Sequence, residues 1–227
     1  MCKIKRLPLP SQRLDCPPME KPSFIYEDAC EGIVCGIDEV GRGPLAGPVV
    51  AAAVVIDRGR MPMDVLSVIN DSKKLTARKR EYLFNKIHEF SHVAIAECSV
   101  EEIDDINILQ ASLRAMKNAC GRLGLKPDAA LVDGNKPPKL ECPVQTLVGG
   151  DAKSFSIAAA SIVAKHYRDE LMKRIANDFP HYGWERNAGY GTAAHLKAME
   201  IHGVTLHHRR SFAPVAKMLL KDSSANN

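Results

Sequence analysis

The chain has 227 residues, 45% of them hydrophobic, and a formal net charge of +4. This is enough to bury a sizeable core in one domain, and the mildly basic balance permits binding to a polyanion without demanding it. Aromatic residues make up only 5% and no apolar run approaches the roughly 18 residues of a membrane span, which argues against a stacking platform for single strands and against a membrane protein.

Residues 1–30 contain several prolines and little hydrophobic periodicity, so we expect an extended or partly disordered N-terminal arm. The folded domain is expected over residues 31–221, including a C-terminal helical extension from about residue 180. Residues 222–227 are expected to form a disordered tail. The odd number of cysteines and the absence of a Cys-x-x-Cys pair favour buried thiols over zinc ligands or disulfides, and we expect a cytoplasmic protein.

Apolar runs predict five strands in the folded domain, over residues 33–37, 49–56, 93–98, 129–132 and 144–148. Helical spacing predicts helices over residues 76–90, 107–123, 154–179, 192–203 and 214–220. Thr76 and Thr192 are the expected N-caps of two of them. This order predicts an α/β fold in which helices flank a mixed five-stranded central sheet.

Four acidic residues follow apolar strands and stand beside glycines, namely Asp38, Glu39, Asp133 and Asp151. Ligand sites in open α/β sheets lie beyond the ends of the strands, so these carboxylates are expected to converge if their strands are neighbours. Close like charges repel, and hard divalent cations such as magnesium relieve that repulsion. The alternative is that each acid is an ordinary turn former or helix cap. The acidic run over residues 101–105 is expected to be the solvated start of a helix.

A glycine turn, Gly41-Arg42-Gly43, comes directly after the first two acids. It is not a dinucleotide fingerprint, because the spacing is wrong, Pro44 intrudes and a strand follows in place of a helix. The glycines instead allow the backbone to approach a ligand closely, and Arg42 is then placed to reach a phosphate or a sugar. A plain turn with a solvated arginine is the alternative.

Basic residues gather in two places, Lys73 to Arg80 and His207 to Arg210. Lysine and arginine side chains of this kind contact phosphates in nucleic-acid complexes, and such binding weakens with salt. Each group could equally be a solvated basic face.

Taken together, these motifs resemble bacterial ribonuclease HII over about residues 33–215. The resemblance rests on several separate motifs in a fixed order: Gly36 to Pro48, Asp71 to Leu75, Asn107 to Ala111, Val132 to Gly134, Gly150 to Ser154, Ser161 to Lys165, Gly189 to Thr192, and Arg209 to Phe212. Each alone is weak, but their combination is highly specific.

The resemblance implies a ribonuclease H-like fold and an endonuclease that hydrolyses the RNA strand of RNA–DNA hybrids. It also implies incision on the 5′ side of ribonucleotides embedded in duplex DNA, leaving 3′-hydroxyl and 5′-phosphate ends, in ribonucleotide and RNA primer removal during DNA replication and repair. Asp38, Glu39, Asp133 and Asp151 match the ligands of two magnesium or manganese ions, with Asp38 bridging both. A monomer is expected.

The resemblance also implies how the substrate is read. The Gly41-Arg42-Gly43 turn matches the family's reader of the ribose 2′-hydroxyl, which alone distinguishes RNA from DNA at one position. Tyr190 matches a tyrosine that stacks on the neighbouring deoxyribose, and Lys73 matches a position that contacts the backbone. One departure concerns the pair before Gly189, where the family often has His-Lys and this chain has Asn187-Ala188. A cationic phosphate contact is therefore missing or supplied elsewhere.

Two other functions remain open at this point. One is a different nuclease of the same fold with four carboxylates, such as a junction resolvase or an exonuclease. The other is a non-catalytic module that binds nucleic acid, which has no need for an acidic cluster beside phosphates.

Overall fold

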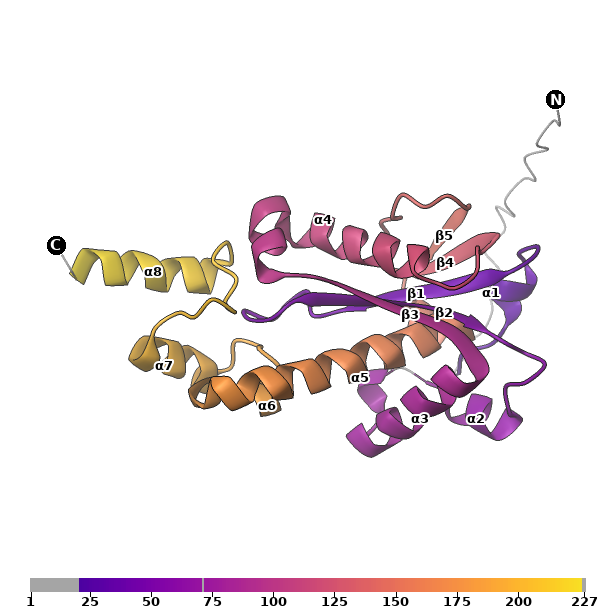
Figure 1. Ribbon diagram of the computed structural model, residues 1–227, viewed down its shortest axis with the longest axis horizontal. Coiled ribbons are helices and arrows are strands. Elements are labelled where there is room, and N and C mark those ends of the chain that lie inside the picture. The colour runs from indigo at the N-terminus through magenta and orange to yellow at the C-terminus, as the bar shows by residue number, and fades with distance from the viewer. Residues whose placement is uncertain (1–20, 71, 226–227) are drawn as a thin grey trace, which may run out of the picture.

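The computed structural model describes residues 21–70 and 72–225. A five-stranded sheet runs through the centre of the molecule in the order β3-β2-β1-β4-β5 (Figure 1). Its strands are β1 (Val34–Val40), β2 (Val49–Ile56), β3 (Ser91–Cys98), β4 (Ala129–Asp133) and β5 (Val144–Leu147). β1 and β3 both pair with β2 in antiparallel fashion, whereas β1–β4 and β4–β5 are parallel. The predicted mixed sheet is therefore confirmed.

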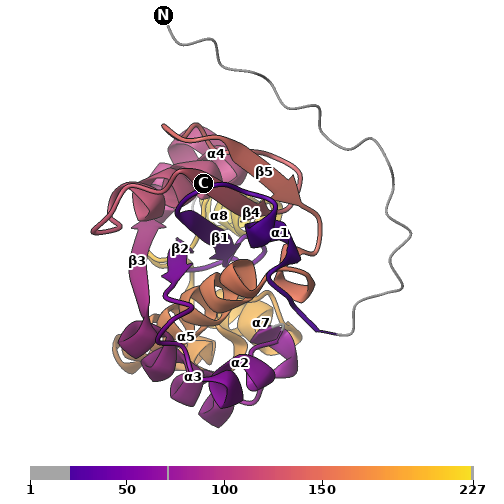
Figure 2. The same ribbon diagram turned by 90° about the vertical axis from the view of Figure 1, so that its right-hand side faces the viewer.

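Helices cover both faces of this sheet (Figure 2). α4 (Val100–Gly121) packs on one face, while α5 (Phe155–Asp178), α3 (Ala77–Phe90) and α2 (Met63–Val68) lie on the other. α5 approaches β1 very closely because β1 has no side chain at Gly36. A Cβ placed there would lie only 2.1 Å from the carbonyl carbon of Ser156, so only glycine fits.

α5 is built for close packing. Ser154 caps its N-terminus by accepting a hydrogen bond from Ile157 N at 3.2 Å, as expected for a residue of this type before a helix. Residues 158–160 are alanines with no exposed surface, which lets the helix axis lie near the strands. The helix predicted over residues 154–179 is thus confirmed almost to the residue.

α4 begins seven residues earlier than predicted. Ser99 and Glu102 form a reciprocal capping box there, so the expected solvated acidic run is the first turn of the helix. The predicted boundary at residue 107 is a kink instead. Asn107 has φ 66° and ψ 161°, and its side-chain oxygen accepts from Leu109 N and Gln110 N, which restarts the helix.

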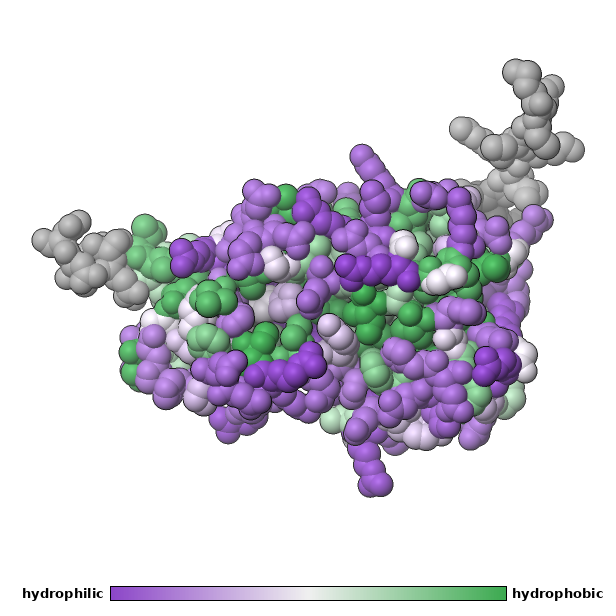
Figure 3. Space-filling view, in the orientation of Figure 1, coloured by the Kyte–Doolittle hydropathy of each residue, from purple (hydrophilic) through white to green (hydrophobic). Residues whose placement is uncertain are grey.

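The chain after α5 forms a separate helical module at one end of the sheet (Figure 1). It contains the 3₁₀ turn η3 (Pro180–Tyr182) and the helices α6 (Trp184–Asn187), α7 (Ala193–His202) and α8 (Ala213–Ala225). Trp184 is fully buried among Met172, Tyr182 and Met199. Hydrophobic residues also show on the surface near this end (Figure 3). The C-terminal helical extension is therefore present. The disordered tail predicted over residues 222–227 is wrong for residues 222–225, because α8 continues to Ala225, and residues 226–227 lie outside the described residues.

The predicted N-terminal arm also ends earlier than residue 30. Residues 21–30 contain α1 (Ile25–Asp28) and pack against the start of α5. Phe24 lies 4.8 Å from Phe155 between ring centroids, and the buried Glu27 carboxylate accepts from Ser154 Oγ at 2.6 Å. Burial of an apolar ring and a paired carboxylate explains why this short segment is held against α5. The rest of the arm, residues 1–20, lies outside the described residues.

None of the helices in residues 21–70 and 72–225 combines the length and apolar character that a membrane crossing requires.

Candidate active site

The first two acids lie inside β1, not after it. Asp38 pairs with Ala52 and Glu39 with Ala51, because β1 continues to Val40. Consecutive strand residues point to opposite faces of a sheet. Asp38 therefore faces α5, and Glu39 faces α4. The two carboxylates therefore lie on opposite sides of β1, near the end of this central strand.

Asp133 lies beside this pair on the neighbouring parallel strand. The last paired residues of β1 and β4 are Ile37 and Val132, so Asp38 and Asp133 come next on each strand. Asp133 Oδ1 accepts from Gly150 N at 2.7 Å, which ties β4 to the 3₁₀ turn η2 (Gly150–Ala152). Asp151 follows Gly150 directly and is buried. The structure thus assembles three of the predicted acids on adjacent strands and ties the turn that bears the fourth to them.

The protein offsets the charges of this acidic group only in part. Burial, followed by the negative charges of Glu39 and Asp133, raises the pKa of Asp38 well above its ordinary value. Hydrogen bonds from Ser161 and from the Glu39 N–H, the latter at 2.8 Å, oppose that rise. Burial also raises the pKa of Glu39, although Arg42, at 3.2 Å from Oε1, acts against it. A cluster of buried carboxylates that repel one another favours a bound cation.

The donor chemistry fits a hard divalent ion. Carboxylate oxygens are the ligands that magnesium and manganese prefer, and a cation offsets both the cost of burying these charges and their mutual repulsion. In the part of the chain that the structure describes, no three His, Cys, Asp or Glu side chains already stand as a ready-made metal group. The strands and η2 therefore bring the four acids of the sequence prediction into one region, without a preformed set of three ligands among the described residues.

Asp38 is connected to the lysine-rich segment through two buried serines. The Ser161 hydroxyl on α5 contacts Asp38 and lies 2.9 Å from the Ser72 hydroxyl. Ser72 begins the 3₁₀ turn η1 (Ser72–Lys74), in which the Lys73 side chain is exposed. Sequence reasoning missed both serines, because a serine on an Ala-rich helix carries no signal of what it faces. Lys73 is thereby placed near the acids through a short polar chain.

Two buried arginines hold the glycine turn and the residues that follow it. Arg209 donates to the carbonyl oxygens of Gly41 at 2.6 Å, Arg42 at 3.0 Å and Gly47 at 2.8 and 2.9 Å. Arg168 on α5 donates to the carbonyls of Ala46, Pro48 and Ala188. Gly41 has φ 93°, and a Cβ there would lie 2.2 Å from Arg168 Nε, so no other residue fits this position.

Two of the residues from His207 to Arg210 fit neither alternative that the sequence left open, a phosphate contact or a solvated basic face. His208 and Arg209 are both buried, with 1% and 0% of their surfaces exposed. Arg209 spends its donors on main-chain carbonyls, and burial lowers its pKa to about 9, so it is charged at neutral pH. Of residues 207–210, Arg210 has an exposed side chain and His207 is half-buried.

Tyr190 lies beside the glycine turn with an exposed ring. A Cβ on Gly43 would lie 3.4 Å from Tyr190 Cε1, and 47% of the tyrosine surface is exposed. Leu45 N donates to Gly189 O at 2.8 Å, which ties the two loops together. The turn, Arg42 and Tyr190 therefore form one surface next to the acids.

The departure at Asn187-Ala188 has a structural explanation. Asn187 Nδ2 donates to Tyr182 O, and its Oδ1 accepts from Gly189 N, both at 2.8 Å. Ala188 adopts φ 49° and ends α6. These residues shape the loop before Tyr190, and neither supplies a cation.

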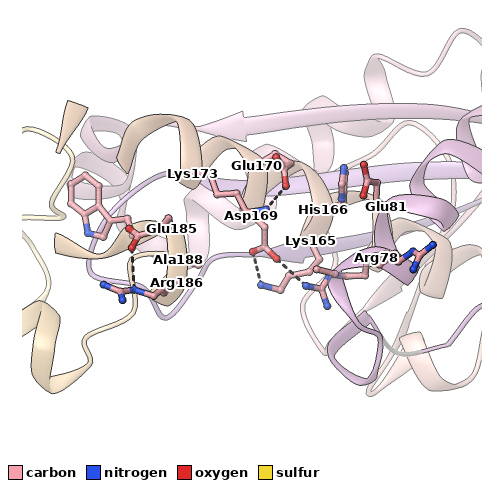
Figure 4. Close-up of a pocket in the computed structure, with 13 residues that line it drawn as sticks. Arg78, Glu81, Lys165, His166, Asp169, Glu170, Lys173, Glu185, Arg186 and Ala188 are labelled. Carbon is pink, nitrogen blue, oxygen red and sulfur yellow. Dashed lines mark hydrogen bonds and ion pairs between the residues drawn. The ribbon is translucent and has the colours of Figure 1, made fainter. Parts of the chain in front are cut away.

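A charged cleft of about 410 Å³ lies between α3, α5 and α6 (Figure 4). Its basic side chains are largely paired with acids. Asp169 accepts from both Lys165 at 2.6 Å and Arg80 at 3.3 Å, and Lys173 pairs with Glu170 at 2.7 Å. Such neutralised pairs offer little net attraction to a phosphate, so this cleft is a weaker candidate than the acidic group.

Comparison with known proteins identifies the family. The family model described as Ribonuclease HII matches residues 35–215. The chain is 57% identical over 199 residues to a protein named Ribonuclease HII from Paramagnetospirillum magneticum, covering 88% of this chain and 99% of that protein. It is 53% identical over 207 residues to another of that name from Gluconobacter oxydans, covering 90% and 99%.

Solved structures show the same fold. The crystal structure of the ribonuclease H2 from Pyrococcus horikoshii OT3 matches with a TM-score of 0.71 and 26% identity, covering 86% of this chain and 100% of that one. A crystal structure of Bst-RNase HIII in complex with Mn²⁺ matches with a TM-score of 0.69, covering 85% and 70%, and its 18% identity speaks for the fold alone. The chain therefore has a ribonuclease H-like fold and belongs to the ribonuclease HII family of endoribonucleases.

Proposed function

We propose that this enzyme hydrolyses the RNA strand of RNA–DNA hybrids and nicks duplex DNA on the 5′ side of an embedded ribonucleotide. The observation that carries the proposal is the position of the acidic group beside the surface formed by Gly41-Arg42-Gly43 and Tyr190. A cluster that suits phosphodiester hydrolysis thus adjoins a surface that suits the reading of a sugar. Relatives at 53–57% identity named as ribonucleases HII support it.

In this proposal the four acids hold divalent metal. Asp38, Glu39, Asp133 and Asp151 would hold two magnesium or manganese ions when the hybrid is present. Bound metal supplies an activated water and neutralises charge on the leaving 3′-oxygen, so that the products carry 3′-hydroxyl and 5′-phosphate ends. The chain's own contribution is to bring carboxylates from β1, β4 and η2 to the same end of the sheet.

The sugar is read at the glycine turn. Exposed Gly43 has no side chain, so a nucleic-acid strand can approach its main chain closely. Main-chain groups and Arg42 are placed to contact the 2′-hydroxyl and the adjoining phosphate, and the Tyr190 ring stacks on the next deoxyribose. Lys73 contacts the strand backbone. The charged cleft of Figure 4, whose basic side chains are largely paired with acids, takes no part in this recognition of the sugar.

The decisive experiment uses duplex DNA that contains one ribonucleotide. The expected product is a single nick on its 5′ side in the presence of magnesium or manganese, with an all-DNA duplex left intact. Cleavage of all-DNA substrates, or of branched junctions in preference, would instead indicate another four-carboxylate nuclease of the same fold.

A metal titration tests the acidic group separately. Calorimetry with Mn²⁺ in the presence of a non-cleavable hybrid is expected to show binding that is lost in Asp133→Asn. Absence of any carboxylate-dependent binding would favour a non-catalytic binding module.

We further propose that the enzyme is a monomer, acts in the cytoplasm, and removes ribonucleotides and RNA primers during DNA replication and repair.

A further inference from the structure

The carbonyl of Tyr190 is gripped by a buried histidine. His195 on α7 has no exposed surface, and its Nδ1 lies 2.9 Å from Tyr190 O. Thr192 N donates to the same oxygen at 2.8 Å. A carbonyl oxygen only accepts, so Nδ1 must carry the ring proton and donate it. The exposed tyrosine is therefore fixed to the protein interior through its main chain.

The other ring nitrogen of His195 confirms this tautomer. Trp184 Nε1 is a donor only, and it lies 3.0 Å from His195 Nε2, which must therefore accept. His208 Nε2 lies 3.1 Å from the same atom. His208 Nδ1 in turn accepts from Thr205 N at 3.0 Å, so His208 Nε2 carries the proton, and it shares the single lone pair of His195 Nε2 with Trp184 Nε1. Each proton in this network has one consistent place.

The network joins the sugar-reading surface to the core of the C-terminal module. His195 N also donates to Thr192 Oγ1, which caps α7 two residues after Tyr190. Trp184, which donates to His195, is fully buried among aromatic rings. The position of the Tyr190 main chain therefore depends on α6 and α7 at once, although its ring lies beside the Gly43 turn.

We propose that His195 is a positioning residue for ribonucleotide discrimination: its Nδ1–H holds the Tyr190 carbonyl and so keeps the tyrosine ring beside the glycine turn. The proposal rests on the function proposed above, in which Tyr190 reads the sugar next to the ribonucleotide. It assigns His195 no contact with the substrate. Its effect is confined to substrates on which Tyr190 acts.

Two isosteric variants separate the contacts of the two ring nitrogens. The amide nitrogen of His195→Asn takes the place of Nδ1 and can still donate to Tyr190 O, whereas the amide of His195→Gln takes the place of Nε2 and cannot. Loss of one hydrogen bond that contributes about 1.4 kcal/mol corresponds to a fall of about tenfold in kcat/KM. We expect kcat/KM on the single-ribonucleotide duplex to fall about tenfold in His195→Gln and much less in His195→Asn, while cleavage of a continuous RNA–DNA hybrid changes little in either.

A double-mutant comparison separates positioning from a general loss of structure. In a Tyr190→Ala background, His195→Gln is expected to cause no further loss on the single-ribonucleotide duplex. An undiminished effect in that background, or an equal loss on both substrates, would overturn the proposal. If the wild-type enzyme does not nick the single-ribonucleotide duplex at all, the proposed function fails, which is a separate result.

A measurement on the wild-type protein covers the case in which the variants do not fold. Nitrogen-15 NMR of the histidine rings distinguishes protonation at Nδ1 from protonation at Nε2. We expect one buried ring, assigned to His195, with its proton on Nδ1. A ring protonated on Nε2 alone cannot hold the Tyr190 carbonyl and would contradict the proposal.

Discussion

Replacing Arg209 with lysine tests whether the glycine turn is held by a guanidinium fork. The four bonds from Arg209 reach three carbonyl oxygens, those of Gly41, Arg42 and Gly47. A lysine ammonium is a compact head without the planar fork, so we expect it to lose at least two of these bonds. Hydrogen bonds to charged groups contribute about 1.5–3 kcal/mol each, so the loss is about 3 kcal/mol or more.

The substitution has no compensating gain. Burial lowers the pKa of Arg209 to about 9, which corresponds to a cost of about 5 kcal/mol for keeping the charge inside the protein. A lysine there either keeps the buried charge while losing part of what offsets it, or gives up its proton and loses the charged donor. The expected destabilisation is a large share of the roughly 5–15 kcal/mol by which folded domains are stable.

Urea unfolding at neutral pH measures this difference, and Arg210→Lys is the matched control. Arg210 is the next residue along and its side chain is exposed, so its replacement is expected to change the free energy of unfolding by less than about 0.5 kcal/mol. If Arg209→Lys is no less stable than Arg210→Lys, the fork does not hold the turn and the reasoning is refuted.

Four further predictions follow from the same contacts. Asp38→Asn is expected to abolish cleavage while hybrid binding in a gel-shift assay survives, and magnesium-dependent activity in this variant would contradict its role. Ser161→Ala removes a hydrogen bond that lowers the pKa of Asp38, so the rising limb of kcat/KM against pH is expected to move to higher pH. Burial lowers the pKa of His208 to about 3, so the native state binds fewer protons than the unfolded state between that value and the ordinary histidine pKa of about 6.5. The free energy of unfolding should therefore fall below pH 6.5 by up to about 1.4 kcal/mol per pH unit, and His208→Gln should flatten that dependence in urea titrations. Glu27→Ala leaves the Ser154 hydroxyl and Ser156 N–H without their partner and is expected to cost about 2 kcal/mol in thermal unfolding, whereas no change would mean that α1 is not anchored there.

Much of the fold was predictable because its signals are local. Strand β2 was predicted over residues 49–56, as observed, because a Val- and Ala-rich run bounded by Pro48 and Asp57 has few alternatives. The cap at Thr76 was predicted for a similar reason, since its hydroxyl needs only Lys79 N three residues later. Such features depend on a handful of neighbouring residues.

The errors arose where distant residues decide the structure. Arg209 looks like a surface cation in the sequence, and only the folded chain brings the carbonyls of residues 41–47 around it. The kink at Asn107 depends on a side-chain oxygen that competes with the main chain for Leu109 N, which hydrophobic spacing does not reveal. Residues 21–30 were predicted to belong to an arm because they follow a proline-rich stretch and show little periodicity, whereas the partner of Glu27 lies more than a hundred positions away.

The candidate site divides in the same way. Asp38, Glu39 and Asp133 could be proposed from their position at strand ends, but the sequence placed Asp38 and Glu39 after the strand and the structure places them within it. The serines and histidines that support the site were not predicted, because each acts through one contact that is nonlocal or buried. Substrate-contacting roles remain predictions that the assays above address.

The three residues Ser154, Ser161 and Arg168 stand seven positions apart on α5, and each anchors a different part of the molecule. Seven residues make nearly two turns, so all three share one side of the helix at intervals of about 10 Å. The helix thus fixes the spacing of these three side chains. Inserting one residue in its middle would rotate the side chains after the insertion by about 100° relative to those before it. Natural variants of this protein should therefore gain and lose residues freely in the loops around the sheet, whereas the length of α5 between Ser154 and Arg168 should stay constant. A library of single-residue insertions scanned along the gene would display this as a sharp gap in tolerance over that stretch.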